Sequence, residues 1–157
     1  FSYHGLPVSH VKRIDSSKNH CQTVEACCTV KCEANSLCYG RHCNETTMAV
    51  VERLGLKSDQ WSLSYQSRLG PVKWLEPSTT QMVEALVKKG VKKLAIVAPA
   101  FLADGLETLE ELDIGIREEF MEHGGTELKV INCLNDDEQW IRGLEQLIAK
   151  EFHHAVA

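Results

Sequence analysis

The side chains best suited to acid–base or metal chemistry are the carboxylates of one acidic stretch, residues 104–122. It holds eight Asp and Glu residues and a single base, Arg117. Glu107 and Glu111 lie four positions apart, so on a helix they would share a face, where like charges cost roughly 0.2–0.5 kcal/mol. A solvated helix face near the positive end of the helix dipole explains such a pair most simply. The alternative, which stays open, is a pair of carboxylates that takes up protons or attracts a cation.

Two short strands are expected to position this chemistry. The apolar run KLAIVAPAF (residues 93–101) leads directly into the acidic stretch, as a buried parallel strand leads into a loop at the carboxyl edge of a sheet. His4 lies where another strand ends and the turn 5–7 begins. A lone histidine is more often structural than functional. An imidazole and carboxylates at one sheet edge would nevertheless form a site for proton transfer or for a divalent cation.

The overall composition indicates one ordinary globular domain, residues 1–157, with 43% hydrophobic and 25% charged residues. A net charge of −5 argues against nucleic acid or an anionic membrane as the main partner. No apolar run approaches the roughly 20 residues of a membrane span, and FSYHGLPVSH has no signal-peptide pattern, so we expect a cytoplasmic protein. The chain opens without Met on what reads as the end of a strand, so we also expect it to be part of a longer protein.

Hydrophobic periodicity predicts alternating helices and strands joined by short connections. That order is typical of a three-layer α/β unit around a parallel sheet. Strands are expected at 61–66, 93–98 and 128–133, and helices at 41–54, from Thr79 or Thr80 to Gly90, at 107–123 and at 136–150. In the last helix, Trp140, Leu144, Leu147 and Ile148 are expected to face the core.

The cysteines form a second candidate centre. Six of the seven lie between Cys21 and Cys43, in the pattern C-x5-C-C-x3-C-x5-C-x4-C. An odd total without a secretory signal makes a disulfide framework a poor explanation, and a metal site the better one. Cys133, on a predicted strand, is interpreted as a small buried hydrophobe.

Other sites are excluded or left open by their motifs. The chain has no GxGxxG, no GxxxxGK[ST] and no GxSxG, so nucleotide binding and serine hydrolysis lose their usual support. Trp74, with Leu75 and Pro77, lies in a loop at the predicted carboxyl edge. Such a loop either packs on its own domain or forms the wall of a pocket for a flat apolar ligand.

Five segments taken in order resemble the ferrochelatases, enzymes that insert Fe²⁺ into a porphyrin to make haem. They are FSYHGLP (1–7), YGRHC (39–43), SYQSRLGPVKWLEPST (64–79), FLADGLETLEELD (101–113) and INCLND (131–136). The resemblance covers nearly the whole chain outside the Cys-rich segment, and it corresponds to the carboxyl-terminal half of a ferrochelatase. It implies a Rossmann-like, chelatase-like domain that faces a missing amino-terminal half across a porphyrin cleft.

The resemblance also implies roles for individual residues. His4 would bind iron or accept a pyrrole proton, and Glu107 would lie across the macrocycle from it and share the metal. Glu111 and Asp113 would belong to an acidic row that guides metal or removes protons. The remaining matches would line the porphyrin pocket: Tyr65, Gln66, Ser67, Arg68, Trp74 and Phe101. Gly105 stands where many family members have His or Cys, which leaves more weight on Glu107 and Glu111.

The Cys-rich segment, residues 16–43, is then an insertion, at a point where the family's usual loop is replaced by residues 36–39. Some ferrochelatases that resemble this chain carry a [2Fe-2S] cluster, which four thiolates hold. The ligands expected here are Cys21, Cys28, Cys32 and Cys38, with Cys43 or Cys27 as substitutes. A structural zinc site is the alternative, although the absence of any C-x2-C weakens it.

The expected function is insertion of Fe²⁺ into protoporphyrin IX, with this piece inactive alone because it supplies one wall of the cleft. The expected partners are porphyrin, ferrous iron and the missing half, without nucleic acid and with at most peripheral membrane contact. Two alternatives stay open. One is a non-catalytic α/β module with a redox-sensing iron-sulfur or zinc loop, and the other is a chelatase for coproporphyrin or another tetrapyrrole and metal.

Overall fold

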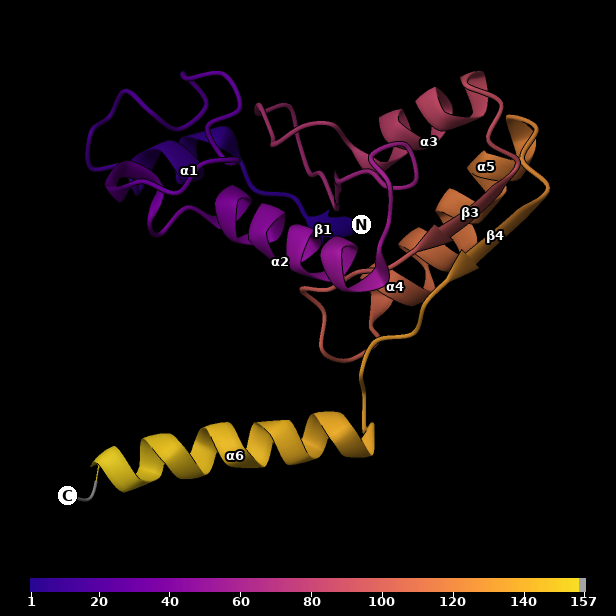
Figure 1. The fold of residues 1–157 in the computed structure, drawn as a ribbon. Coiled ribbons are helices and arrows are strands. Elements are labelled where there is room, and N and C mark those ends of the chain that lie inside the picture. The colour runs from indigo at the N-terminus through magenta and orange to yellow at the C-terminus, as the bar shows by residue number, and fades with distance from the viewer. Residues whose placement is uncertain (156–157) are drawn as a thin grey trace.

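The computed structural model describes residues 1–155 and shows an α/β fold, as the sequence predicts (Figure 1). The strands are parallel and alternate with helices. In chain order the elements are β1 (Ser2–His4), α1 (Val8–Arg13), the 3₁₀ turn η1 (Glu33–Asn35), α2 (Tyr39–Leu54), β2 (Ser64–Gln66), α3 (Thr79–Lys88), β3 (Lys93–Ile96), α4 (Leu106–Leu109), the π-helical η2 (Glu111–Ile116), α5 (Arg117–Glu122), β4 (Glu127–Val130) and α6 (Glu138–Ala155).

The strands form two parallel pairs that lie next to each other. In one pair Ser2 of β1 lies opposite Ser64 of β2, and in the other Lys93 of β3 lies opposite Glu127 of β4. The N–H of Ser2 donates to the carbonyl of Val97 at 2.9 Å, which brings β1 beside the end of β3. The spatial order is therefore β2-β1-β3-β4, and the carboxyl ends of β1 and β2 share one edge.

Two hydrophobic cores hold the chain together. The first contains Tyr3, Val11, Tyr65 and Leu75 together with three cysteines of the inserted segment, Cys21, Cys38 and Cys43. The second lies between the β3-β4 pair and helices α3 and α5, with Val83, Ile96, Leu112, Phe120 and Leu128. The Cys-rich segment is thus packed into the first core, although its sequence carries no clear hydrophobic period.

Local signals set most helix ends. Gly55, with a φ of 64°, ends α2, and Gly90 follows α3 with a φ of 88°. α3 begins at Thr79, and its N-cap is Ser78, one residue before the predicted Thr79 or Thr80, because the Ser78 side chain accepts from the N–H of Gln81 at 3.1 Å. Helix α1 was not expected, and it forms where Val8 and Val11 become buried.

A groove of about 510 Å³ lies along the face where β1 and β2 are short. Strand pairing covers only 64–66 of the predicted strand 61–66. Apolar side chains of α2, α3 and β3 line the groove, among them Leu54, Met82, Leu86 and Leu94. The α-ammonium group of Phe1 lies at one end and donates to the carbonyl of Ser62 at 2.8 Å.

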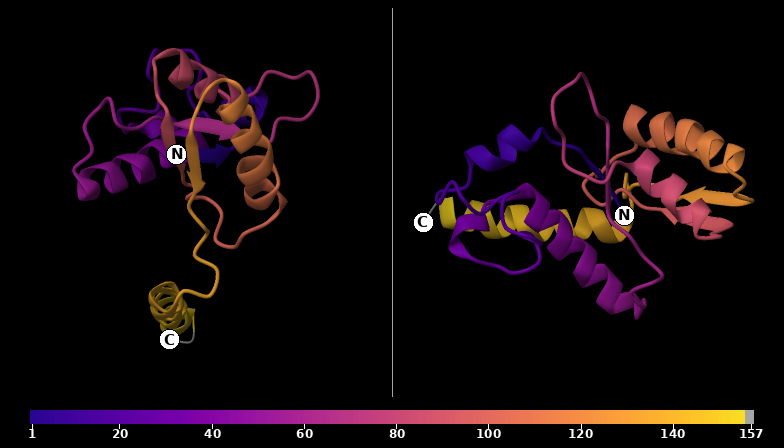
Figure 2. Two further views of the ribbon diagram at one scale, coloured as in Figure 1. Left: turned by 90° about the vertical axis from the view of Figure 1, so that its right-hand side faces the viewer. Right: turned by 90° about the horizontal axis from the view of Figure 1, so that it is seen from above.

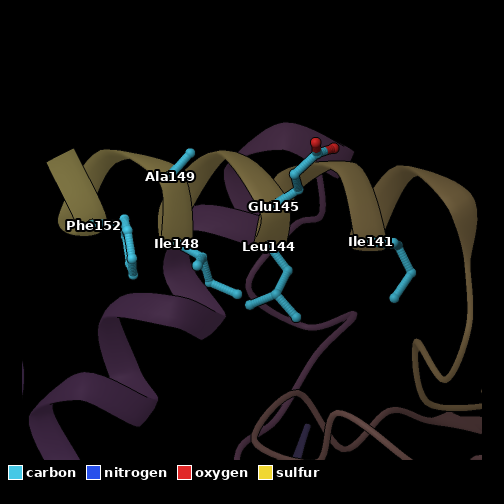
Figure 3. A pocket seen from close by; sticks show the side chains of 6 residues that line it. All are labelled: Ile141, Leu144, Glu145, Ile148, Ala149 and Phe152. Atoms are coloured by element: carbon cyan, nitrogen blue, oxygen red, sulfur yellow. The ribbon is translucent and has the colours of Figure 1, made fainter.

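Helix α6 stands apart from the rest of the chain, on the side opposite α3 and α5 (Figures 1 and 2). Its apolar residues Ile141, Leu144, Ile148 and Phe152 point to one side of the helix (Figure 3). Leu147 and Ile148 are about 60% exposed, so the prediction that they face the core of this chain is wrong. In the described part of the chain, no helix has both the length and the apolar content to span a membrane.

Candidate functional site

His4 is the last residue of strand β1. One of its ring nitrogens makes a hydrogen bond within the chain, and the other is available as an acceptor. Its Nδ1 lies 2.7 Å from the carbonyl oxygen of Gly5. Because a carbonyl only accepts, Nδ1 carries the proton in the neutral ring and Nε2 presents a lone pair. The half-buried ring lies 6.3 Å from the ring of Phe101, centroid to centroid. The imidazole is therefore oriented to accept a proton or a metal ion at Nε2, beside an aromatic wall.

The peptide between His4 and Gly5 is held at both ends. Its carbonyl accepts from the phenol of Tyr39 at 2.8 Å, and its N–H donates to the carbonyl of Gln66 at 2.7 Å. A Cβ on Gly5 would lie 2.8 Å from that same Gln66 oxygen and 3.3 Å from the ring of Trp74. Only glycine fits there, because any side chain would separate the two strands.

The acidic helix reaches the same edge through Glu111. Its carboxylate accepts from the Ser67 N–H at 2.6 Å and from the Ser67 hydroxyl at 2.5 Å. Gln66, which lies opposite His4 in the strand register, donates from its side-chain amide to the main-chain carbonyl of Glu107 at 2.7 Å. The ends of β1 and β2 and the start of the acidic helix thus meet, and they bring His4, Glu107 and Glu111 to one edge.

Gly105 leaves room for the Glu107 carboxylate. A Cβ on Gly105 would lie 3.2 Å from a Glu107 carboxylate oxygen. The position where many ferrochelatases have His or Cys is therefore next to Glu107. Here the absence of a side chain leaves that half-buried carboxylate uncrowded.

The side chain of Asp113 points away from that of Glu111. It pairs with Arg117, whose guanidinium also donates to the carbonyl of Leu128 on β4. Residues two apart on a helix do not face each other, so Glu111 turns towards Ser67 while Asp113 turns towards β4. The expected acidic row is interrupted after Glu111.

Two residues expected to line a porphyrin pocket have side chains that are buried within this chain. Tyr65 is 6% exposed and points into the first core, since it alternates with Ser64 and Gln66 along β2. Gln66 is 2% exposed, and its amide bridges Ser2 and Glu107. Both side chains are thus taken up by packing or hydrogen bonds within the chain, and their role in binding a porphyrin stays a prediction.

Arg68, Trp74 and Phe101 lie nearer the edge. Arg68 donates to the carbonyl of Leu75 at 2.9 Å, and Phe101 flanks His4. Trp74 packs over Gly5 and forms an isolated bridge with Pro7. Among the described residues, its buried Nε1 has no hydrogen-bond partner.

The inserted segment gathers four thiols. The sulfurs of Cys27 and Cys28 lie 3.8 Å apart, and the Cys38 thiol interacts with those of Cys21 and Cys28. A hydrogen bond from Cys28 lowers the pKa of Cys38 to about 5, whereas burial raises the pKa of Cys21 to about 12. The group is therefore Cys21, Cys27, Cys28 and Cys38.

Cys32 and Cys43 lie outside this group. The Cys32 sulfur is 3.6 Å from Nε2 of His20. Burial raises the pKa of the Cys43 thiol to about 12, although its hydrogen bond with Tyr39 acts in the opposite direction. Cys27, expected only as a substitute, thus takes the place predicted for Cys32. Within the described residues, no three His, Cys, Asp or Glu side chains are arranged to hold a metal ion.

Two polar residues that the sequence did not single out shape this segment. Asp15 accepts from the N–H groups of Ser17, His20 and Cys21, and these bonds with the Ser17 hydroxyl hold its pKa well below the usual range. Asn35 donates to the carbonyls of Cys27 and Val30. An Asp or Asn ahead of a Ser or Cys in a loop is the only local signal for such caps, and it is common in any loop.

Comparison with known proteins identifies the family of the chain. The Ferrochelatase family model matches residues 1–152. A ferrochelatase of Bdellovibrio bacteriovorus is 43% identical over 148 residues, which cover 94% of this chain and 43% of that protein. A ferrochelatase of Pseudomonas fluorescens strain Pf0-1 is 45% identical over 147 residues, and one of Stutzerimonas stutzeri 44% over 151 residues.

The chain spans less than half the length of these relatives, 43–44% of each. The match nevertheless runs through nearly all of the chain, including the edge that carries His4 and the acidic helix. The chain belongs to the ferrochelatase family.

Proposed function

We propose that this chain supplies one wall of the metal-insertion site of a longer ferrochelatase, which inserts Fe²⁺ into protoporphyrin IX. The observation that carries the proposal is His4, whose Nε2 is left available by the Nδ1 contact to Gly5 at the edge that also holds Glu107 and Glu111. Membership of the ferrochelatase family supports a porphyrin as the substrate class. The same edge would suit coproporphyrin, which is the nearest alternative substrate.

Metallation removes two pyrrole protons and strips water from Fe²⁺. The neutral His4 ring can accept a proton at Nε2, while the Gly5 carbonyl stabilises the charged ring through Nδ1–H. Glu111 cannot swing freely, because Ser67 holds both of its oxygens. In the described part of the chain, the bond from Gln66 holds the main-chain carbonyl of Glu107 and not its carboxylate, so this carboxylate is the freer group to attract the incoming cation.

The partner implied by this role is the remainder of the longer protein. The cleft needs a second wall, and the described chain offers one edge. We therefore expect no haem formation by this chain alone. Haem formation by the isolated chain would contradict the proposal. We place the longer protein in the cytoplasm, with at most peripheral membrane contact and no nucleic-acid partner.

The decisive experiment measures zinc and iron insertion into protoporphyrin by the longer protein and its His4→Ala variant. Insertion should fall at least about 100-fold, the usual contribution of a positioned acid–base group. His10→Ala is the matched control, since His10 is exposed on α1 and should leave insertion unchanged. A folded His4→Ala variant with full turnover would refute the assignment. Coproporphyrin in a parallel assay decides between the two porphyrins.

We further propose that the inserted segment binds a [2Fe-2S] cluster through Cys21, Cys27, Cys28 and Cys38. The support is chemical: four thiols of the segment lie near one another and one has a lowered pKa, although in the described residues they are not arranged to hold a metal ion. When bound, the cluster would supply one-electron redox chemistry. The other assignments are a structural zinc site, and a module that only senses redox state without metal insertion.

Iron, zinc and acid-labile sulfide analysis of the longer protein separates these assignments. Equal iron and sulfide, lost on Cys27→Ala but retained on Cys32→Ala, would support the proposed ligands. Cys133→Ala is the control, because Cys133 lies beside Asp104 and away from the segment. Stoichiometric zinc without sulfide would replace the cluster with the zinc site.

A further inference from the structure

Tyr39 lies between the two candidate centres. It is the first residue of α2, and it follows Cys38, a member of the thiol group. Its phenol donates to the carbonyl of His4 at 2.8 Å and also contacts the thiol of Cys43. Burial raises the pKa of Tyr39, so the phenol stays a donor over the working pH range.

The hydrogen bond from Tyr39 to the His4 carbonyl fixes the plane of one peptide group, the one between His4 and Gly5. That plane carries the His4 carbonyl on one side and the Gly5 N–H on the other, and the latter donates to Gln66. The next carbonyl along the chain, that of Gly5, holds Nδ1 of the imidazole. Without the phenol, the His4 carbonyl would lack its donor and the plane would be held at one end only. The orientation of the imidazole therefore depends on Tyr39.

The residue that follows Tyr39 lies near two of the thiols. A Cβ on Gly40, the next residue, would lie only 3.1 Å from the Cys28 sulfur and 3.9 Å from the Cys38 sulfur. The first turn of α2 is thus in close contact with the sulfurs, and His42 donates to the carbonyl of Cys38 at 3.1 Å. Because no side chain at Gly40 separates the helix from these sulfurs, we expect a rearrangement of the sulfurs to shift the start of α2.

We propose that Tyr39 is a positioning residue that couples the thiol group to His4, so that the arrangement of the sulfurs sets the orientation of the imidazole. The functional consequence rests on the proposed role of His4, but the coupling itself does not. The rigid ring of Tyr39, with two side-chain torsions, transmits displacement better than a flexible side chain would.

The test is a double-mutant cycle on this chain, read by ¹⁵N NMR of the His4 ring and by hydrogen exchange of the Gly5 amide. In the wild type, Cys28→Ala should shift the His4 ring resonances and speed exchange of the Gly5 amide at least about threefold. In the Tyr39→Phe background the same Cys28→Ala change should leave both unchanged. Tyr3→Phe is the control. It loses a hydroxyl bond to Thr47 at 2.8 Å without touching the His4 peptide, so the response to Cys28→Ala should persist.

Equal responses in the wild type and in Tyr39→Phe would overturn the coupling, and so would no response in the wild type. If Cys28→Ala unfolds the chain, Cys28→Ser serves as the milder change, since the smaller oxygen loosens the approach to Gly40 while keeping a polar atom. Neither readout uses porphyrin, iron or turnover. A chain that shows the coupling while the longer protein fails to insert metal would separate this inference from the proposed function.

Discussion

The hydrogen bonds of single residues decide what the candidate site can do. The sequence places His4 at a strand end, but the choice of free ring nitrogen comes from the Gly5 carbonyl. The sequence likewise places Ser67 near the site, but its bond to Glu111 depends on a backbone φ of 62°. A non-glycine residue in that region is strained by about 1 kcal/mol, which the two bonds to Glu111 offset.

Ser67 is therefore expected to respond differently to two substitutions. Ser67→Ala removes the hydroxyl bond to Glu111 and keeps the strain, so the free energy of unfolding should fall by about 1–2 kcal/mol. Ser67→Gly removes the same bond but relieves the strain, so its loss should be smaller by about 1 kcal/mol. Urea unfolding measures both. Equal losses would show that the backbone at this position is not strained.

The amino group of Phe1 predicts a pH dependence of stability. Burial lowers its pKa from 8.0 to about 6 in the folded chain. Between pH 6 and pH 8 the unfolded chain therefore binds more protons, and the free energy of unfolding should rise with pH. A two-unit difference sets an upper limit of about 2.7 kcal/mol, and we expect about 1–2 kcal/mol.

Chemical denaturation at pH 6, 7 and 8 measures this slope. Acetylation of the amino group is the matched control, since it removes the titrating charge. It should remove the amino group's contribution to the slope of the free energy of unfolding with pH. A slope that acetylation leaves unchanged would contradict the assignment to the amino group of Phe1.

At the scale of elements, strand β1 reaches β2 only because Gly5 has no side chain. In Gly5→Ala the new Cβ would lie 2.8 Å from the Gln66 carbonyl, so the strands must separate. We expect a loss of at least about 2 kcal/mol in the free energy of unfolding. The control is Gly143→Ala in α6, where no atom lies within 4 Å and the change should stabilise the helix by about 0.5–1 kcal/mol. Similar effects of the two changes in thermal denaturation would contradict the close approach.

The alternation of elements could be predicted because each one follows local rules. Apolar runs gave β3 and β4, and glycines at positive φ ended α2 and α3. Helix α1 and the packing of the Cys-rich segment could not be predicted. Val8 and Val11 form too short a pattern, and the fold of the segment depends on side-chain caps such as Asp15. The sequence favoured Cys32 over Cys27 as a ligand, but three-dimensional packing places Cys27 beside Cys28 and Cys32 beside His20.

At the scale of the whole molecule, two apolar surfaces of the chain remain uncovered. One is the side of α6 with Ile141, Leu144, Ile148 and Phe152, whose periodicity correctly indicated a helix but not what it faces (Figure 3). The other is the groove beside β1. A prediction of burial from periodicity alone assumes that the partner is within the same chain, and for α6 the described chain does not supply it.

The groove has room for an extended segment beside β3. Ile96 faces β4, since its carbonyl accepts from the N–H of Ile131 at 2.8 Å. By alternation, the backbone groups of Ala95 and Val97 point to the other side, towards β1 and the groove. Of these, the Val97 carbonyl is taken by Ser2. An extended segment joined ahead of Phe1 would lie between β2 and β3. It would pair with the remaining backbone groups of Ala95 and Val97.

An added N-terminal segment such as Val-Ile-Val-Leu should therefore stabilise the chain. Burying two or more of its side chains should raise the free energy of unfolding by at least about 2 kcal/mol, and the amides of Ala95 and Val97 should become protected from hydrogen exchange. The pH slope from the Phe1 amino group should disappear as well, because that nitrogen becomes an amide. A Gly-Ser-Gly-Ser extension is the control, which removes the same charge without filling the groove. Equal stability of the two extensions, or unprotected Ala95 and Val97 amides in the apolar one, would show that the groove does not accept a strand.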